Sequence, residues 1–262
     1  MKIRTCAVAG MFYPRDPHHL EQLLEKLFGG KETSLDAKGI VSPHAGYPYS
    51  GEVAASAYST IPSTFSGTFI VIGPSHRGFQ TCISQIPWET PLGIIDIDLE
   101  LGSVIDLETD EISHRDEHSL EVQMPFIKYR FPRARILPIL MGDQEFVASE
   151  LLATKVLDAI NQTGREDIRF VASSDFSHYV PIASARENDG YAIEALTSLD
   201  LPEFYRRIAR RGVSACGYGP IAAVCHLCKE RGARTGRLIR YATSGDVTGD
   251  SDVVGYAAIA VM

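Results

Sequence analysis

The segment Thr68-Phe69-Ile70-Val71-Ile72-Gly73-Pro74-Ser75-His76 joins a continuous apolar run to a turn that ends in a histidine. Its first five residues are all β-branched or aromatic. This pattern is typical of a strand that is buried on both faces. Strands of that kind occur in sheets that helices cover on both sides, and the turn residues that follow bring the backbone close to any group bound there.

Shorter apolar runs and amphipathic stretches alternate on both sides of this segment. Further strands are predicted at residues 39–41, 81–86, 93–97, 135–141, 168–172, 237–242 and 253–261. Helices are predicted at residues 17–28, 51–61, 119–130 and 144–160, with two or three more within 183–231. Strands separated by helices imply an α/β fold, with a central, mostly parallel sheet flanked by helices on both faces and some antiparallel edge.

Composition and charge are those of a globular protein without affinity for nucleic acid. Of 262 residues, 45% are hydrophobic and 22% charged, and no repeat or linker divides the chain, so residues 1–262 are expected to form one domain. The net charge is −8, and the basic residues cluster no further than the pairs Arg206-Arg207 and Arg210-Arg211. Because nucleic-acid binding usually needs a basic stripe that displaces phosphate counterions, no such partner is expected.

The sequence also predicts a cytoplasmic protein without a membrane anchor. No stretch of 18 apolar residues is present, and residues 1–6 lack the apolar region of a signal peptide. The five cysteines are an odd number, which favours reduced thiols. Cys225 and Cys228 have CxxC spacing, but no second pair completes a zinc site, and their apolar neighbours predict a packed helix instead.

Histidines follow three of the predicted strands. His44, His76 and His178 come after apolar runs, and Asp246 follows a fourth. In open α/β sheets ligands bind beyond the carboxyl ends of the strands, so these side chains are expected to meet in one cleft. Two histidines and one carboxylate suit non-haem iron(II), and imidazole also suits zinc or copper. The predicted ligands are therefore His44, His76 and Asp246, with Asp175 as the alternative carboxylate.

Four residues near these strand ends are candidates for catalysis or substrate binding. His178 is predicted to be a general acid/base, since its ordinary pKa lies near the working pH, and Asp175 would orient its imidazole. His118 stands at the start of a predicted helix, where it either is solvated beside acidic residues or lines the cleft. Ser75 beside His76 keeps a hydrolase open as an alternative, although the spacing misses that of a nucleophile elbow by one residue.

An ordered set of motifs spans the chain: Ala9-Gly10-Met11-Phe12-Tyr13-Pro14, Pro43-His44-Ala45-Gly46-Tyr47, Gly73-Pro74-Ser75-His76, Glu117-His118-Ser119-Leu120-Glu121 and Asp175-Phe176-Ser177-His178. Together with Cys216-Gly217 and Pro220-Ile221, they resemble the Memo family from end to end. The resemblance implies the fold of class III extradiol dioxygenases, in which two histidines and a carboxylate hold iron(II) and a further histidine is an acid/base.

The resemblance also assigns roles by position. His44 and His76 resemble the two histidine ligands and His178 the acid/base, while Asp246 would supply the carboxylate. His118, Ser75 and Tyr47 lie within the motifs and are expected to line the cleft around the metal.

This leaves different classes of function open. The first is metal-dependent redox chemistry, as an oxidase or a dioxygenase-like enzyme acting on a small organic substrate, with iron(II) expected and copper or zinc as alternatives. The second is a non-catalytic module that recognises a peptide or an anionic ligand in a vestigial, metal-free cleft. A hydrolase that uses Ser75 is the third. Prokaryotic relatives often accompany a radical-SAM protein and a small partner protein, so the resemblance implies such partners.

Overall fold

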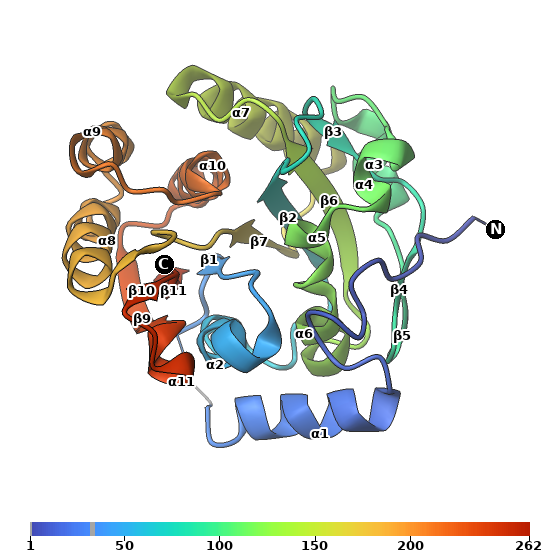
Figure 1. Ribbon diagram of the computed structural model, residues 1–262. Coiled ribbons are helices and arrows are strands. Elements are labelled where there is room, and N and C mark those ends of the chain that lie inside the picture. The colour runs from blue at the N-terminus through green and yellow to red at the C-terminus, as the bar shows by residue number, and fades with distance from the viewer. Residues whose placement is uncertain (1, 32–34) are drawn as a thin grey trace.

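A seven-stranded sheet runs through the middle of the computed structural model, which describes residues 2–31 and 35–262 (Figure 1). Its strands lie in the order β3 (Cys82–Ile83), β6 (Arg135–Met141), β2 (Thr68–Pro74), β7 (Ile168–Ser173), β1 (Gly39–Ser42), β11 (Gly255–Val261) and β9 (Gly236–Thr243). The four strands from β6 to β1 are parallel, whereas β3 and β11 run against their neighbours. The predicted α/β class, a mostly parallel sheet with antiparallel edges, is confirmed.

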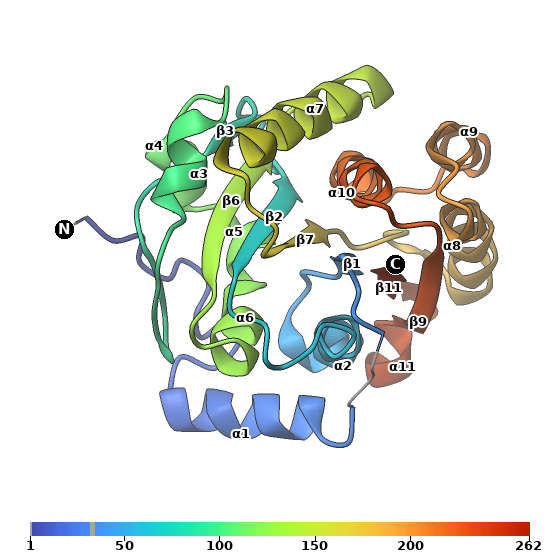
Figure 2. The ribbon, with the colours of Figure 1, turned by 180° about the vertical axis from the view of Figure 1, so that it is seen from behind.

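Helices cover both faces of this sheet, as Figures 1 and 2 show. One face packs against α1 (Pro17–Phe28), α2 (Tyr47–Tyr58), α5 (His118–Glu121) and α6 (Met124–Arg130). The other packs against α3 (Leu99–Val104), α7 (Phe146–Thr163), α8 (Ile182–Thr197), α9 (Leu201–Arg211) and α10 (Tyr218–Glu230). The remaining short elements are β4 (Trp88–Thr90), β5 (Gly93–Ile95), α4 (Glu111–Arg115), β8 (Val180–Pro181), α11 (Gly245–Thr248) and β10 (Asp252–Val253).

The strand β2 shows why the sheet is buried on both faces. All seven of its residues are buried. Ile70 and Ile72 enter the core beneath α7 and α10, while Phe69 and Val71 enter the core beneath α1, α2 and α6. Successive side chains of a strand point to opposite faces, so an unbroken apolar run fills two cores at once. Each such side chain stabilises the fold by about 1.5–3 kcal/mol through burial.

Local signals explain the helix ends that the sequence predicts well. The Asp16 carboxylate accepts the N–H of His19 and caps α1, whose first residue is a proline that has no N–H to satisfy.

The predicted packed helix around Cys225 and Cys228 is α10, and both thiols are fully buried in it. All five cysteines are free, as the odd count predicted. None of the helices within residues 2–31 and 35–262 is long and apolar enough to cross a membrane.

The structure corrects two predicted helices at the edge where the strands end. The helix predicted at residues 51–61 already begins at Tyr47, directly after the loop that follows β1. The helix predicted at residues 119–130 is two short helices, because the chain turns at Val122–Gln123 and Pro125 then occupies the first turn of α6. The break lets α5 present its first residues to the end of the sheet.

Candidate metal centre

The carboxyl ends of three neighbouring strands build one side of the site. Strand β7 lies between β1 and β2, and Ser42 of β1 pairs in register with Ser173 of β7. His44 follows β1, and His76 follows β2. The predicted gathering of these two histidines at one edge of a parallel sheet is what the topology produces.

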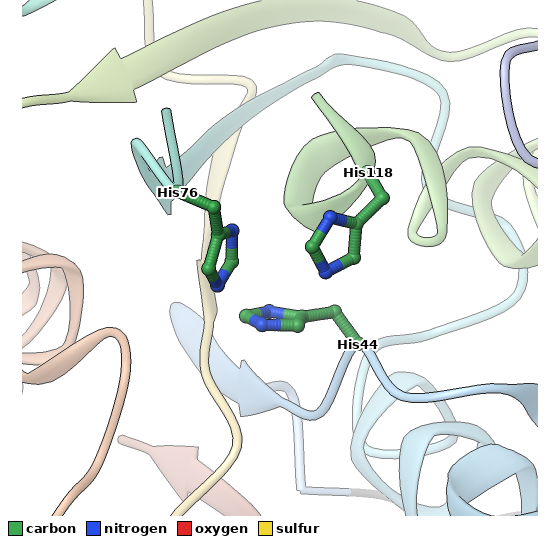
Figure 3. Close-up of side chains that lie close together, drawn as sticks. All are labelled: His44, His76 and His118. Atoms are coloured by element: carbon green, nitrogen blue, oxygen red, sulfur yellow. The ribbon is translucent and has the colours of Figure 1, made fainter. Parts of the chain in front are cut away.

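Three histidines converge at this edge, as Figure 3 shows. One nitrogen from each of His44, His76 and His118 lies within 4.8 Å of the other two. The ring centroids are 5.2 Å apart for His44 and His76, 5.4 Å for His44 and His118, and 4.5 Å for His76 and His118. His44 is buried, His118 is partly exposed and His76 is exposed, so the cluster opens to solvent on one side.

His118 occupies the place that the sequence analysis gave to a carboxylate. It is the first residue of α5, directly after Glu117, and its ring faces His44 and His76. From the sequence alone, its role was open between a solvated helix entry and the cleft. The signal that pointed to the cleft was its place in the motif Glu117–Glu121.

Asp246 does not join the three histidines. Its carboxylate accepts the N–H of Thr243 at 2.7 Å and pairs with Arg186 at 2.8 Å. Strand β9 does end at the predicted edge, but β11 lies between β9 and β1. Neighbouring strands are about 4.8 Å apart, so the end of β9 is displaced from β1 by roughly 10 Å. The expected set of two histidines and Asp246 is therefore not the set that the fold brings together.

Glu117 forms hydrogen bonds with both the ring and the backbone of His76. Its buried carboxylate lies 2.9 Å from the Nδ1 atom of His76 and accepts the backbone N–H groups of His76 and Ser119, each also at 2.9 Å. Burial raises the pKa of Glu117, but the hydrogen bonds from His76 and Ser119 outweigh burial and lower the pKa to about 2. An ionised Glu117 therefore orients the imidazole of His76, as carboxylates do behind metal-binding histidines.

Burial keeps the other two imidazoles neutral. The pKa of His44 is well below its usual value because of burial and then because of the neighbouring His118 and His76. The pKa of His118 is lowered by burial and then by His76. A neutral imidazole has a free nitrogen lone pair, which is the form that binds metal ions.

A thiol that was not among the predicted site residues lies beside the cluster. The Sγ atom of Cys216 is 3.2 Å from Nε2 of His44 and accepts the N–H of Asp175 at 3.3 Å. Burial, and then the nearby Asp175, raises the pKa of this thiol well above its usual range. Its only signal in the sequence was the pair Cys216-Gly217 within the family motifs.

Asp175 holds the loop after β1 and not the ring of His178. Its Oδ1 atom accepts the N–H of His44 at 2.8 Å and the N–H of Ala45 at 3.3 Å. Burial raises the pKa of Asp175 to about 6, against the lowering effect of the bond from His44. The ring of His178 instead places Nδ1 at 2.9 Å from the carbonyl oxygen of Ser214. Because a carbonyl only accepts, Nδ1 carries the proton and Nε2 of His178 has a free lone pair.

The hydroxyl groups of Ser75 and Tyr47, the other predicted cleft residues, form hydrogen bonds with residues outside the histidine cluster. The Ser75 hydroxyl oxygen accepts the N–H of Phe79 at 2.8 Å. Nδ1 of the neighbouring His76 is engaged by Glu117, so these contacts do not form a serine–histidine pair. Tyr47 is buried, and its hydroxyl donates to the carbonyl of Val122 at 2.8 Å.

Comparisons with known proteins find similarity over nearly the whole chain. The chain matches the family model described as Memo-like protein over residues 4–260. A MEMO1 family protein of Methanosarcina barkeri is 46% identical, and the match covers 99% of this chain and 100% of the relative. MEMO1 family proteins of Archaeoglobus fulgidus and Nitrosopumilus maritimus are 42% and 39% identical, each over 98% of both chains.

Proposed function

This chain belongs to the Memo family, within the class III extradiol dioxygenase-like superfamily, and we propose that His44, His76 and His118 hold a transition-metal ion for redox chemistry on a small organic substrate. The proposal rests on one observation, the approach of three imidazole nitrogens to within 4.8 Å of one another. Two imidazole nitrogens bound to one tetrahedral zinc ion at about 2.0–2.1 Å are about 3.3–3.4 Å apart. The side chains would therefore move by less than about an ångström to bind one ion.

The chemistry of the donors narrows the choice of metal. Imidazole nitrogen suits iron, copper and zinc, whereas a thiol favours softer ions such as copper(I) and zinc. Cys216 lies 3.2 Å from Nε2 of His44 but outside the group of donor atoms that lie within 4.8 Å of one another, so it would have to move toward the cluster to add a fourth donor. With Asp246 directed toward Arg186, we propose copper ahead of the iron(II) that the expected carboxylate would have favoured. Zinc suits the same donors but has no redox chemistry of its own. When bound, such an ion would polarise a substrate oxygen, and copper or iron would also exchange electrons.

Residues around the cluster would prepare the site for this chemistry. Glu117 orients His76, and Asp175 fixes the backbone of the loop that presents His44. His178 would take or give a proton at Nε2, since its Nδ1 proton is held by Ser214. These roles follow from the hydrogen bonds of each residue and require no movement of the sheet.

The test is the metal content of protein purified without oxygen. We expect about one ion per chain in the wild type, none in His44→Ala, His76→Ala or His118→Ala, and wild-type content in Asp246→Ala. The reverse result, with loss in Asp246→Ala and retention in His118→Ala, would restore the set of two histidines and one carboxylate. Oxygen uptake with a panel of catechols then tests redox turnover. A wild type that is metal-free and inert would instead favour the non-catalytic binding module.

A further inference from the structure

Building on the proposed metal centre, we propose that Ser173 is the positioning residue that makes His44 present an unprotonated Nε2 atom to the ion. Ser173 is the last residue of β7, and its hydroxyl group is fully buried. The Oγ atom lies 3.0 Å from Nδ1 of His44. Which of these two atoms donates decides which nitrogen of His44 can bind metal, because a neutral imidazole carries one proton.

The orientation of Gln123 is fixed by groups that have only one hydrogen-bonding role. Its Nε2 atom lies 2.9 Å from the carbonyl oxygen of Pro43, which can only accept, so this end of the amide is the NH2 group. Its Oε1 atom correspondingly accepts the hydroxyl of Tyr58 at 3.0 Å. The second proton of the NH2 group is then directed to Oγ of Ser173 at 2.8 Å.

The single proton of Ser173 is committed as well. Its Oγ atom lies 2.6 Å from the carbonyl oxygen of Ser119, which only accepts, so the hydroxyl must donate there. One lone pair of Oγ takes the N–H of Gln123, and the other faces Nδ1 of His44. Nδ1 therefore carries the proton of His44. Nε2, which lies 3.2 Å from Sγ of Cys216, keeps the lone pair and is the nitrogen left free to bind an ion.

The same hydroxyl also couples two of the proposed ligands. The Ser173 hydroxyl donates to the carbonyl oxygen of Ser119, which directly follows His118 in α5. The Oγ atom of Ser173 also accepts the Nδ1 proton of His44. Ser173 thus joins the end of β7, the loop after β1 and the first turn of α5. This single residue fixes the protonation pattern of one ligand and the position of the helix that bears another.

The nitrogen chemical shifts of the His44 ring test this in metal-free wild-type protein at a pH where His44 is neutral. Two-bond proton–nitrogen correlation spectra separate protonated from unprotonated ring nitrogens, and His44→Gln identifies the signals. We expect a protonated Nδ1 and an unprotonated Nε2. The opposite pattern in the wild type overturns the proposal, and this reading requires no metal to bind.

The effect on binding is tested with Ser173→Ala and cobalt(II) as the probe. Without the acceptor, Nδ1 should lose its fixed proton, the spectrum should show a mixture of both ring forms, and cobalt affinity should fall about 10- to 100-fold. Ser173→Thr, which keeps the hydroxyl, should retain the wild-type ring form and most of the cobalt affinity. It is the variant to compare with the wild type if Ser173→Ala does not fold.

Ser42→Ala is the matched control. Ser42 pairs in register with Ser173 on the adjacent strand, is equally buried, and its hydroxyl oxygen has no hydrogen-bond partner among the described residues. This change should leave the ring form and the affinity as in the wild type. Unchanged ring signals and cobalt affinity in Ser173→Ala would refute the role of Ser173. If the wild type binds no cobalt but shows the expected ring form, the metal centre fails and the assignment of the His44 proton stands.

Discussion

Replacing Arg4 by methionine should destabilise the protein and weaken metal binding at the proposed centre. Arg4 is buried and lies 2.6 Å from the Glu121 carboxylate. It also donates to the carbonyl oxygens of His114 and Glu117, each at 2.8 Å, and its guanidinium group lies 4.0 Å from the centre of the Trp88 ring. Arg4 therefore ties the amino-terminal segment to α5, the helix that begins with His118.

The expected magnitude follows from what the change leaves behind. Glu121 would remain as a buried charge, and removing one partner of a buried ion pair costs about 3–5 kcal/mol. The carboxylate keeps three donors, the N–H groups of Ala7 and Val8 and the hydroxyl of Tyr13, which favours the lower part of that range. Two carbonyl oxygens lose a charged donor, which adds to the loss. We therefore expect Arg4→Met to lower the free energy of unfolding by about 3–5 kcal/mol.

Urea unfolding of the metal-free protein at neutral pH measures this difference. Arg77→Met is the control, because Arg77 pairs with Asp116 at 2.9 Å but is about half exposed, and such pairs contribute at most about 1 kcal/mol. Arg4→Lys should fall between the two, since an ammonium group keeps the charge but cannot reach all three acceptors. A cost for Arg4→Met no larger than that for Arg77→Met would refute the reasoning. If Arg4→Met folds, its metal affinity should also be reduced.

Three further outcomes are expected. His178→Ala should retain metal while turnover falls about 10²–10⁴-fold, and equal loss of metal in this variant would make His178 a ligand. The double change of Cys225 and Cys228 to serine should leave metal content unchanged but lower stability in urea, because both thiols are fully buried and serine there would lack solvent. Burial raises the pKa of Asp98, but a hydroxyl donor, a backbone N–H and nearby arginines including Arg165 outweigh it and lower that pKa. The contribution of Asp98 to stability is therefore present above its unfolded pKa of about 3.9 and is lost as the pH falls through its folded pKa. In urea unfolding, the difference in stability between the wild type and Asp98→Asn should shrink below about pH 4.

The strands at the centre of the sheet were readable from the sequence because their signal is local. The run from Thr68 to Ile72 needs burial on both sides wherever it lies, and Arg135–Met141 is a strand with the predicted bounds. Parallel strands end at the same edge, so His44 and His76 were predictable neighbours before the strand order was known. The weaker signals failed where short elements depend on what they pack against, as with the two-residue strand β3 in place of residues 81–86.

The rest of the site was decided by the lateral order of the strands and by how loops pack on them. The pattern of a strand gives the face of the sheet to which each side chain points, but it does not tell which strand lies beside it. The position of β11 between β1 and β9, which separates Asp246 from His44, could therefore not be predicted from local sequence. The positions of His118 and Cys216 beside His44 likewise depend on contacts between residues far apart in the chain. The sequence determined at which edge of the sheet His44 and His76 lie, and tertiary packing decided which third side chain joins them. The reason is that side-chain clusters depend on distances of a few ångströms, while strand signals place residues only by edge and face.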